Sequence, residues 1–138
     1  MDAEDPFLTF LNNGFDTIEG WPGRKESVRF LQVFRDLFES SAQNGGACEI
    51  GVHHAKYLIA LHNLLGGNKA SLGLDLFEKR EKNIDGSGRG SRDICLANIA
   101  KFAKNPHLVR LVSHDSISLK IREVKALCVG YSPFFSLV

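Results

Sequence analysis

Three acidic residues stand at the ends of short apolar runs, and their types and spacing could bind a nucleotide-like ligand. Glu49 and Gly51 close a first run over residues 47–51, Asp75 closes a second, and Asp115 follows a third. A glycine at such a point lets the backbone turn sharply and lets a ligand approach the main chain. An acid about 20 residues further on commonly receives ribose hydroxyls in nucleotide-binding sheets. These residues therefore predict a site for an adenosine-type cofactor.

The segment after Gly51 supplies groups for the rest of such a ligand. The backbone amides of residues 52–55, beginning with Val52 and His53, are expected at a helix N-terminus, where they favour a carboxylate. Glu49 could offset a cationic amino or sulfonium group nearby. A turn that binds no ligand is the open alternative, because a glycine after a strand is common.

The other two acids each have two interpretations. After the third apolar run, Asp115 would accept a hydrogen bond from an adenine amino group, and Ser116 would line the ring. In the competing interpretation, Asp115 or Ser116 caps the following helix. Asp75 could likewise be a helix cap or a solvated loop residue. Leu76, directly after it, belongs to the predicted cofactor site.

Alternating strand and helix patterns must position these residues. Apolar residues at spacings of three and four predict a helix over residues 24–41, which glycines end. Short apolar runs alternating with helices predict an α/β fold with a Rossmann-like, doubly wound parallel sheet, which binds ligands at the carboxyl ends of its strands. Further helices are expected over 54–65, 91–104 and 116–127, and strands over 47–51, 70–77, 108–113 and 133–138.

Two parts of the chain are expected. Residues 1–45 would form an N-terminal helical cap, and residues 46–138 would form the nucleotide-binding sheet domain. A doubly wound sheet normally continues for several strands beyond a fourth. The sheet domain is therefore expected to be incomplete, truncated after its fourth strand.

Composition narrows the classes of function. Of 138 residues, 43% are hydrophobic and 24% charged, and 17 basic residues nearly balance 16 acidic ones. This balance gives no support to nucleic-acid or membrane-surface binding, and no apolar run approaches the roughly 20 residues that span a bilayer. The acidic N-terminus is unlike a secretory signal, so a cytoplasmic location is expected. The three distant cysteines predict buried free thiols, with no metal site or disulfide scaffold.

These placements resemble the class I S-adenosylmethionine-dependent methyltransferases. The resemblance covers about residues 47–138 and is strongest at 48–54, 71–77 and 111–116. It implies that Glu49, Gly51 and the loop with Val52 and His53 hold the methionine part of S-adenosyl-L-methionine. It also implies that Asp75 holds the ribose and Asp115 meets the adenine. The stretch beginning at Leu74 looks like a bacterial branch that methylates small molecules. The leading hypothesis is a methyltransferase of this kind that acts on oxygen.

The sequence also departs from this family. Ala55 stands where the family often has a last glycine, and the His53-His54 pair occupies positions that are usually small. The segment that follows the fourth strand in the family is absent, so no catalytic or metal-binding residue can be carried over.

Two other classes of function stay open. An NAD-dependent oxidoreductase domain would need Gly-x-Gly-x-x-Gly after the first strand, and bulky residues occupy both later positions. A catalytically inactive fragment would expose a sheet edge, which favours self-association and makes a homo-oligomer possible.

Overall fold

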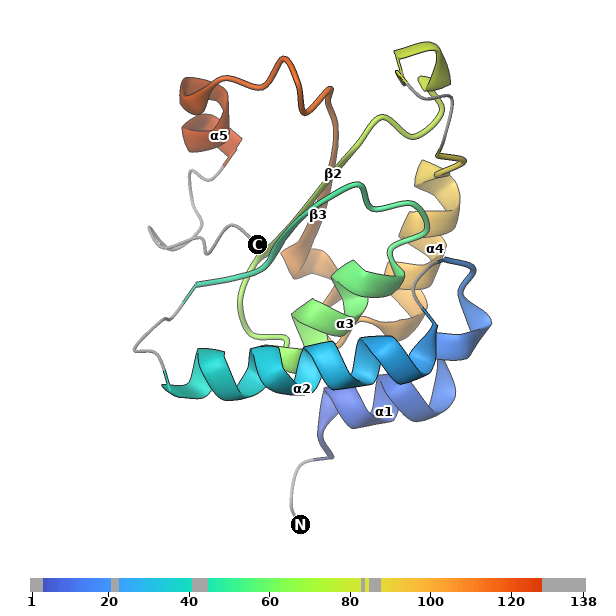
Figure 1. The fold of residues 1–138 in the computed structure, drawn as a ribbon, viewed down its shortest axis with the longest axis vertical. Coiled ribbons are helices and arrows are strands. Elements are labelled where there is room, and N and C mark those ends of the chain that lie inside the picture. The colour runs from blue at the N-terminus through green and yellow to red at the C-terminus, as the bar shows by residue number, and fades with distance from the viewer. Residues whose placement is uncertain (1–3, 21–22, 41–44, 83, 85–87, 128–138) are drawn as a thin grey trace.

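A three-stranded parallel sheet lies between two layers of helices (Figure 1). The computed structural model describes residues 4–20, 23–40, 45–82, 84 and 88–127. The strands lie in the order β1-β2-β3, and both neighbouring pairs are parallel. In chain order the elements from β1 onward are β1 (Cys48–Ile50), α3 (Lys56–Leu64), β2 (Ser71–Asp75), η2 (Arg80–Lys82), α4 (Arg92–Phe102), η3 (Pro106–Leu108), β3 (Val109–Ser113) and α5 (Ile121–Leu127).

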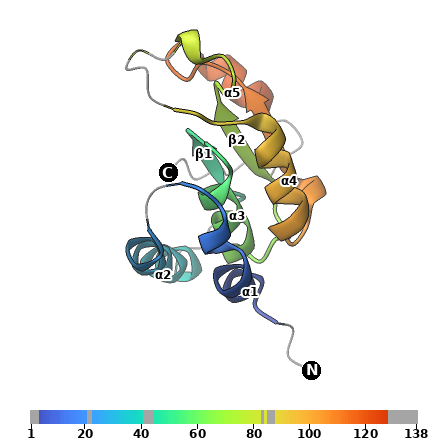
Figure 2. The ribbon, with the colours of Figure 1, turned by 90° about the vertical axis from the view of Figure 1, so that its right-hand side faces the viewer.

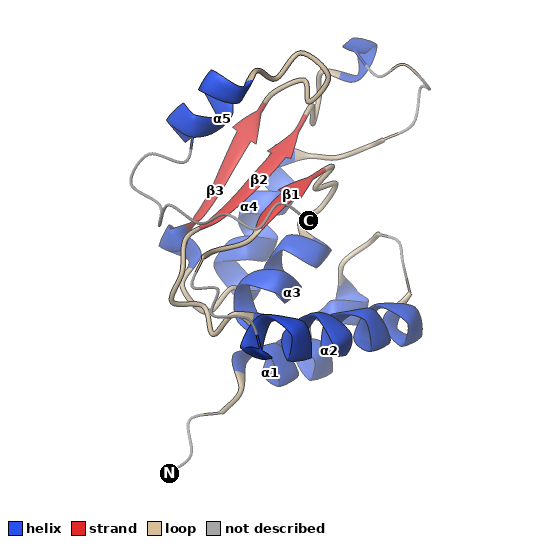
Figure 3. Ribbon diagram, turned by 60° about the vertical axis from the view of Figure 1, so that its left-hand side comes forward, coloured by secondary structure: helices blue, strands red, loops and turns tan. Residues whose placement is uncertain are grey.

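This arrangement confirms the predicted α/β class with a parallel sheet. Each of the first three predicted strands and each helix between them is present, and Figure 3 shows the three strands pointing the same way. The predicted strand over residues 133–138 lies outside the described residues.

The two faces of the sheet are covered differently. Helices α3 and α4 pack on one face as part of a large apolar core. A Cβ atom on Gly73 of β2 would lie 2.8 Å from Leu58 of α3 and 2.9 Å from Val52, so only glycine allows α3 to pack this closely. On the opposite face, Cys48, Leu72 and Leu74 form a smaller cluster, against which Leu119 and Leu127 of the α5 region pack.

Two N-terminal helices extend the larger core. Helix α1 (Pro6–Asn13), a short 3-10 helix η1 (Phe15–Thr17) and α2 (Arg24–Ser40) precede the sheet, and α1 and α2 lie side by side beyond α3 (Figure 2). Asp5 caps α1 by accepting the Phe7 amide at 2.9 Å, and it also pairs with Arg35 of α2 at 3.0 Å. Three aromatic side chains of this region, Phe7, Phe10 and Phe15, are buried in the same core as α3.

Three element boundaries differ from the sequence prediction. The helix expected from residue 54 begins at Lys56, because His53 and Ala55 adopt positive φ angles of 54° and 69°. Strand β2 ends at Asp75, so the predicted extension to residue 77 is wrong. The helix expected from residue 116 begins at Ile121, since Asp115 accepts the Ile117 amide at 3.0 Å and forms a turn there.

Two compositional expectations can be compared with the structure. Cys48 and Cys95 are buried and form no disulfide bond within the described residues, as predicted, and Cys128 lies outside those residues. Within the described ranges, no helix combines the length and the apolar character needed to cross a bilayer.

Candidate functional site

Asp75, at the carboxyl end of β2, anchors the loop that follows β1. Its Oδ2 atom accepts the amides of Val52 at 2.6 Å and His53 at 2.8 Å, and its Oδ1 atom accepts the Phe77 amide at 2.9 Å. Hydrogen bonds from backbone N–H groups to a carboxylate are stronger than those between neutral groups. One side chain therefore fixes the loops after two neighbouring strands.

The backbone around this anchor is strained. Among the described residues, the only non-glycine positions with positive φ are His53, Ala55 and Phe77, at 54°, 69° and 51°. Each such conformation costs on the order of 1–3 kcal/mol and persists only where the surroundings enforce it. The backbone N–H groups of His53 and Phe77 donate to Asp75, so these hydrogen bonds help hold both residues in the strained conformation. Strain of this kind is commonly found at functional sites.

Two adjoining cavities open at the carboxyl ends of the strands. The first has a volume of about 140 Å³, and the second, of about 210 Å³, lies between the loops after β2 and β3. They share Leu76 and His114. The first is lined by Ile50, Gly51, Leu74, Asp75, Leu76, His114 and Ser116, and the second by Leu76, Lys79, Lys82, Ser113, His114, Asp115 and Ser118.

Five predicted site residues meet at these cavities. Gly51, Asp75, Leu76 and Ser116 line the first, and Asp115 lines the second. These residues come from loops after all three strands, as the parallel topology requires. The structure thus brings together the predicted ribose and adenine contacts along one edge of the sheet.

Glu49, Val52 and His53 do not line either cavity. The Val52 side chain is buried in the core. The amides of Val52 and His53 were expected to meet a ligand carboxylate, but in this structure they donate to Asp75. That expectation is corrected: the chain's own carboxylate occupies the position that a ligand anion would need.

Glu49 has a carboxyl group in an unusual environment. Burial raises its pKa to about 8, with a further increase from the negative charge of Asp75, although the Leu58 backbone N–H opposes this shift. Its Oε2 atom is buried and has no hydrogen-bond partner among the described residues. Glu49 is therefore protonated at neutral pH, and a cation placed beside it would favour the charged form.

The two histidines of the loop are packed against each other. The ring centroids of His53 and His54 lie 4.0 Å apart, and burial lowers the pKa of His54. The Cys95 thiol donates to the His53 carbonyl at 2.9 Å, and burial raises the pKa of this thiol to about 12. A thiol that stays protonated is a poor nucleophile. In the described part of the chain, no group of three or more His, Cys, Asp or Glu side chains could hold a metal ion.

His114 is a site residue that sequence reasoning did not select. It follows β3 and lines both cavities. Its Nδ1 atom lies 2.8 Å from the Asp115 carbonyl oxygen, and its Nε2 atom lies 3.7 Å from Glu123. Its place directly before Asp115, at a strand end, was a signal that could have identified it.

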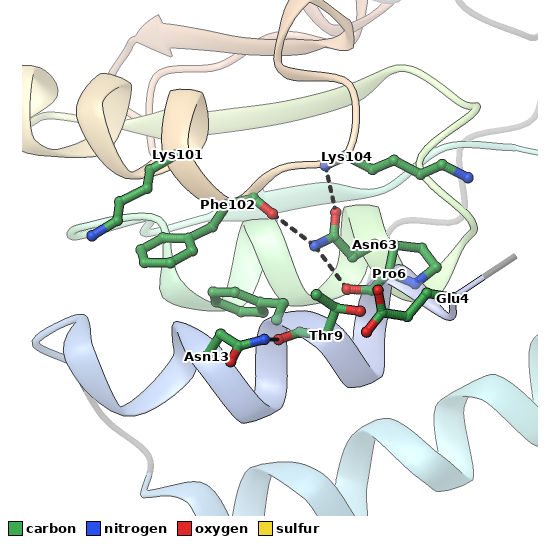
Figure 4. Close-up of a pocket in the computed structure, with 9 residues that line it drawn as sticks. Glu4, Pro6, Thr9, Asn13, Asn63, Lys101, Phe102 and Lys104 are labelled. Carbon is green, nitrogen blue, oxygen red and sulfur yellow. Dashed lines mark hydrogen bonds between the residues drawn. The ribbon is translucent and has the colours of Figure 1, made fainter.

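A larger cavity, of about 450 Å³, lies among α1, α3 and the end of α4 (Figure 4). Asn63 lies in its wall and donates to the Pro6 and Phe102 carbonyls at 3.3 and 3.0 Å, while it accepts the Lys104 amide at 2.9 Å. None of the described side chains lining this cavity has a buried polar atom without a partner. It offers a ligand no unmet hydrogen-bonding group, unlike the region around Glu49.

The chain matches no family model, no curated protein and no solved structure. The function is therefore inferred from the geometry of the two cavities at the carboxyl ends of the strands.

Proposed function

We propose that the two cavities at the carboxyl edge of the sheet bind S-adenosyl-L-methionine. The chain would then be the cofactor-binding part of a methyltransferase that acts on a small molecule, with oxygen as the accepting atom. The observation that carries this proposal is the convergence of Gly51, Asp75, Leu76 and Ser116 on one cavity, with Asp115 on the adjoining one. Asp75 is the position expected for the ribose and Asp115 for the adenine, while Gly51 is one of the positions expected for the amino-acid part.

The position of α5 supports a doubly wound sheet. Helices α3 and α4 pack on one face and α5 on the other. Crossovers between parallel strands are right-handed, so a helix on the opposite face leads the chain in the opposite direction across the sheet. A parallel strand after α5 would therefore lie beside β1. That would make β1 the point where the strand order reverses, where such folds bind ligands.

The residues present are compatible with this cofactor. Gly51 has φ of 84°, and a Cβ atom there would meet nothing within 4 Å, so the backbone is open to a ligand. An ionised carboxylate has about four acceptor positions. Asp75 uses three of them within the chain, which leaves one for a ribose hydroxyl. The Oε2 atom of Glu49, which has no hydrogen-bond partner among the described residues, could balance an amino or sulfonium charge near it.

The cavity volumes set a condition on this proposal. Ligand pockets for molecules of this size measure roughly 300–1,000 Å³. The first cavity, at about 140 Å³, is smaller, so the ligand would extend into the adjoining one past Leu76 and His114.

The chemistry suits a chain without an evident catalytic set. The cofactor supplies an activated methyl group, so the protein contributes mainly proximity and orientation. Residues that hold the cofactor and exclude water are then sufficient for much of the rate enhancement.

A dinucleotide ligand is a weaker alternative. It needs small residues where its pyrophosphate crosses the loop after β1. Here His53 stands at the second glycine position and Lys56 at the third, and the His53 amide already donates to Asp75.

Isothermal titration calorimetry with S-adenosylhomocysteine and with NAD tests the proposal. We expect S-adenosylhomocysteine to bind and NAD to give no heat. Leu76→Arg would fill both cavities and should abolish binding, whereas Leu96→Arg, at a half-exposed position on α4, should leave affinity unchanged. Binding of NAD alone, or equal affinities of the two variants, would overturn the proposal.

A further inference from the structure

Helix α2 carries an apolar stripe that the described residues of its own chain leave uncovered. Phe30, Val33 and Leu37 are 51%, 56% and 64% exposed, although each is a large apolar side chain. Their spacing of three and four residues places them on one side of the helix. In contrast, the buried residues of α2 are Ser27 and Leu31, which lie toward the core. We call Phe30, Val33 and Leu37 the α2 stripe.

The residues beside the α2 stripe have a pattern of charge. Arg29 and Asp36 are seven residues apart, so they lie on the same flank of the stripe, one near each end. Neither side chain makes an ion pair or a hydrogen bond with another residue in the described ranges. More broadly, the first half of α2 is rich in basic residues and the second half contains Asp36 and Glu39.

This pattern is self-complementary for two antiparallel helices. When two copies of one helix pack antiparallel about a two-fold axis, a given flank of one helix faces the same flank of the other. Arg29 of each copy then lies opposite Asp36 of the other, and both pairs form by symmetry. The stripes meet between them, with Val33 close to the axis.

We propose that α2 is the interface of a symmetric dimer, in which the α2 stripe packs antiparallel against that of a second copy of this chain. The other side of α2 is held by the Arg35–Asp5 ion pair and by Leu31, which is buried in the same core as α3. Phe30, at one end of the α2 stripe, also contacts Tyr57 of α3, with ring centroids 6.4 Å apart, while half of its side chain stays exposed. This interface does not depend on the proposed function.

Light scattering and sedimentation equilibrium over a range of concentrations test this assignment. The wild-type chain should be a dimer, and Val33→Asp should be monomeric with an unchanged circular dichroism spectrum. Leu8→Asp is the matched control, because Leu8 is a 49% exposed leucine on α1, outside the α2 stripe. It should dimerise like wild type.

Charge exchange tests the antiparallel orientation. Arg29→Glu or Asp36→Arg alone should weaken the dimer by about tenfold, because two symmetry-related pairs become repulsive. The double variant R29E/D36R should restore the wild-type dissociation constant. A monomeric wild-type chain at every concentration would overturn the proposal, as would a dimer insensitive to Val33→Asp. A dimer lost in Val33→Asp but not restored in the double variant would reject the antiparallel arrangement.

Discussion

Two polar side chains at opposite ends of the sheet perform the same structural task in different settings. Asp75 binds three backbone amides at the carboxyl end, and Asn63, near the amino end, binds two carbonyls and one amide. Asn63 is neutral, 2% exposed and has no strained neighbours. Asp75 is charged, only partly buried, and surrounded by strained residues and cavities. Joining backbone segments needs neither charge nor strain, so the charge and strain at the carboxyl end are consistent with the ligand site proposed there.

The largest effect is expected at the neutral anchor. Asn63→Leu would leave three backbone groups of the α1 and α4 regions without partners in the interior. Each such group costs about 1–3 kcal/mol, so we expect a loss of about 3–5 kcal/mol in the free energy of unfolding, measured by urea denaturation. Asn13→Leu, at an exposed asparagine, is the control and should change stability by less than about 0.5 kcal/mol. Equal effects of the two variants would contradict this role for Asn63.

The charged anchor should matter less for stability and more for binding. Asp75→Ala removes three hydrogen bonds that a partly exposed carboxylate accepts. We therefore expect the free energy of unfolding to fall by about 2–3 kcal/mol. The strained loop should relax, and S-adenosylhomocysteine binding should disappear in calorimetry. Asn63→Ser offers a comparison, since a partial loss of stability there should leave binding intact in the folded protein. Retained binding by Asp75→Ala would show that the loop does not shape the site.

Groups at the two ends of the sheet should also make stability depend on pH in opposite directions. The folded-state pKa of Glu49 is raised to about 8 from 4.5, so the folded protein holds a proton that the unfolded chain releases. The contribution of Glu49 to the free energy of unfolding is fully present below pH 4.5 and is lost as the pH rises to about 8. Because the residue keeps some exposure, we expect a total change of about 2 kcal/mol. Glu49→Gln should remove this slope in thermal unfolding followed from pH 5 to 8. An unchanged slope would contradict the assignment to Glu49.

His62, near the amino end, gives the opposite dependence. Its ring lies 3.0 Å from the Ser71 hydroxyl, and burial, with a smaller effect from His107, lowers its pKa to about 4 from 6.5. The unfolded chain therefore binds a proton that the folded protein excludes. Stability should fall as the pH drops from 6.5 to 4, by at most about 1.4 kcal/mol per pH unit. Unfolding of His62→Gln, in which the amide can still bond Ser71, should lack this fall.

The sequence predicted the order of the helices and strands well, but it did not predict the hydrogen bonds that hold the site together. Apolar periodicity is a local property, and it located α2 and the three strands to within about two residues. The turn at His53 and Ala55 escaped prediction because Asp75, 22 residues after His53, helps hold it in place. Nothing in the local pattern shows where a carboxylate finds its donors.

Asn63 shows a signal that could have been used. It interrupts the apolar residues of α3, next to His62 and Leu64, at a position that proves to be 2% exposed. A polar residue on a buried helix face needs hydrogen-bond partners, so its position predicts a buried network. The sequence could not show which distant carbonyls would supply it.

The smallest loss of stability is expected from a change at the start of α4, the helix that connects the two ends of the sheet. The helix begins near the crevice, where Gly90 packs closely against the His53 carbonyl, and it ends at the carbonyl of Phe102 that Asn63 binds. Ser91 caps its first turn by accepting the Ile94 amide at 3.4 Å, a long and exposed bond. Ser91→Ala should therefore cost about 0.5 kcal/mol, the low end for loss of a helix cap.

Ser91→Ala is informative because its effect on stability can be compared with its effect on ligand affinity. If α4 transmits its position to the His53 loop through Gly90, Ser91→Ala should weaken S-adenosylhomocysteine binding by more than its effect on stability would suggest. Ser91→Asp restores a capping oxygen and should recover both quantities, as calorimetry and urea denaturation would show. Loss of stability without loss of affinity would mean that Asp75 alone fixes the His53 loop. The two cavities at the carboxyl ends of the strands would then be independent of α4.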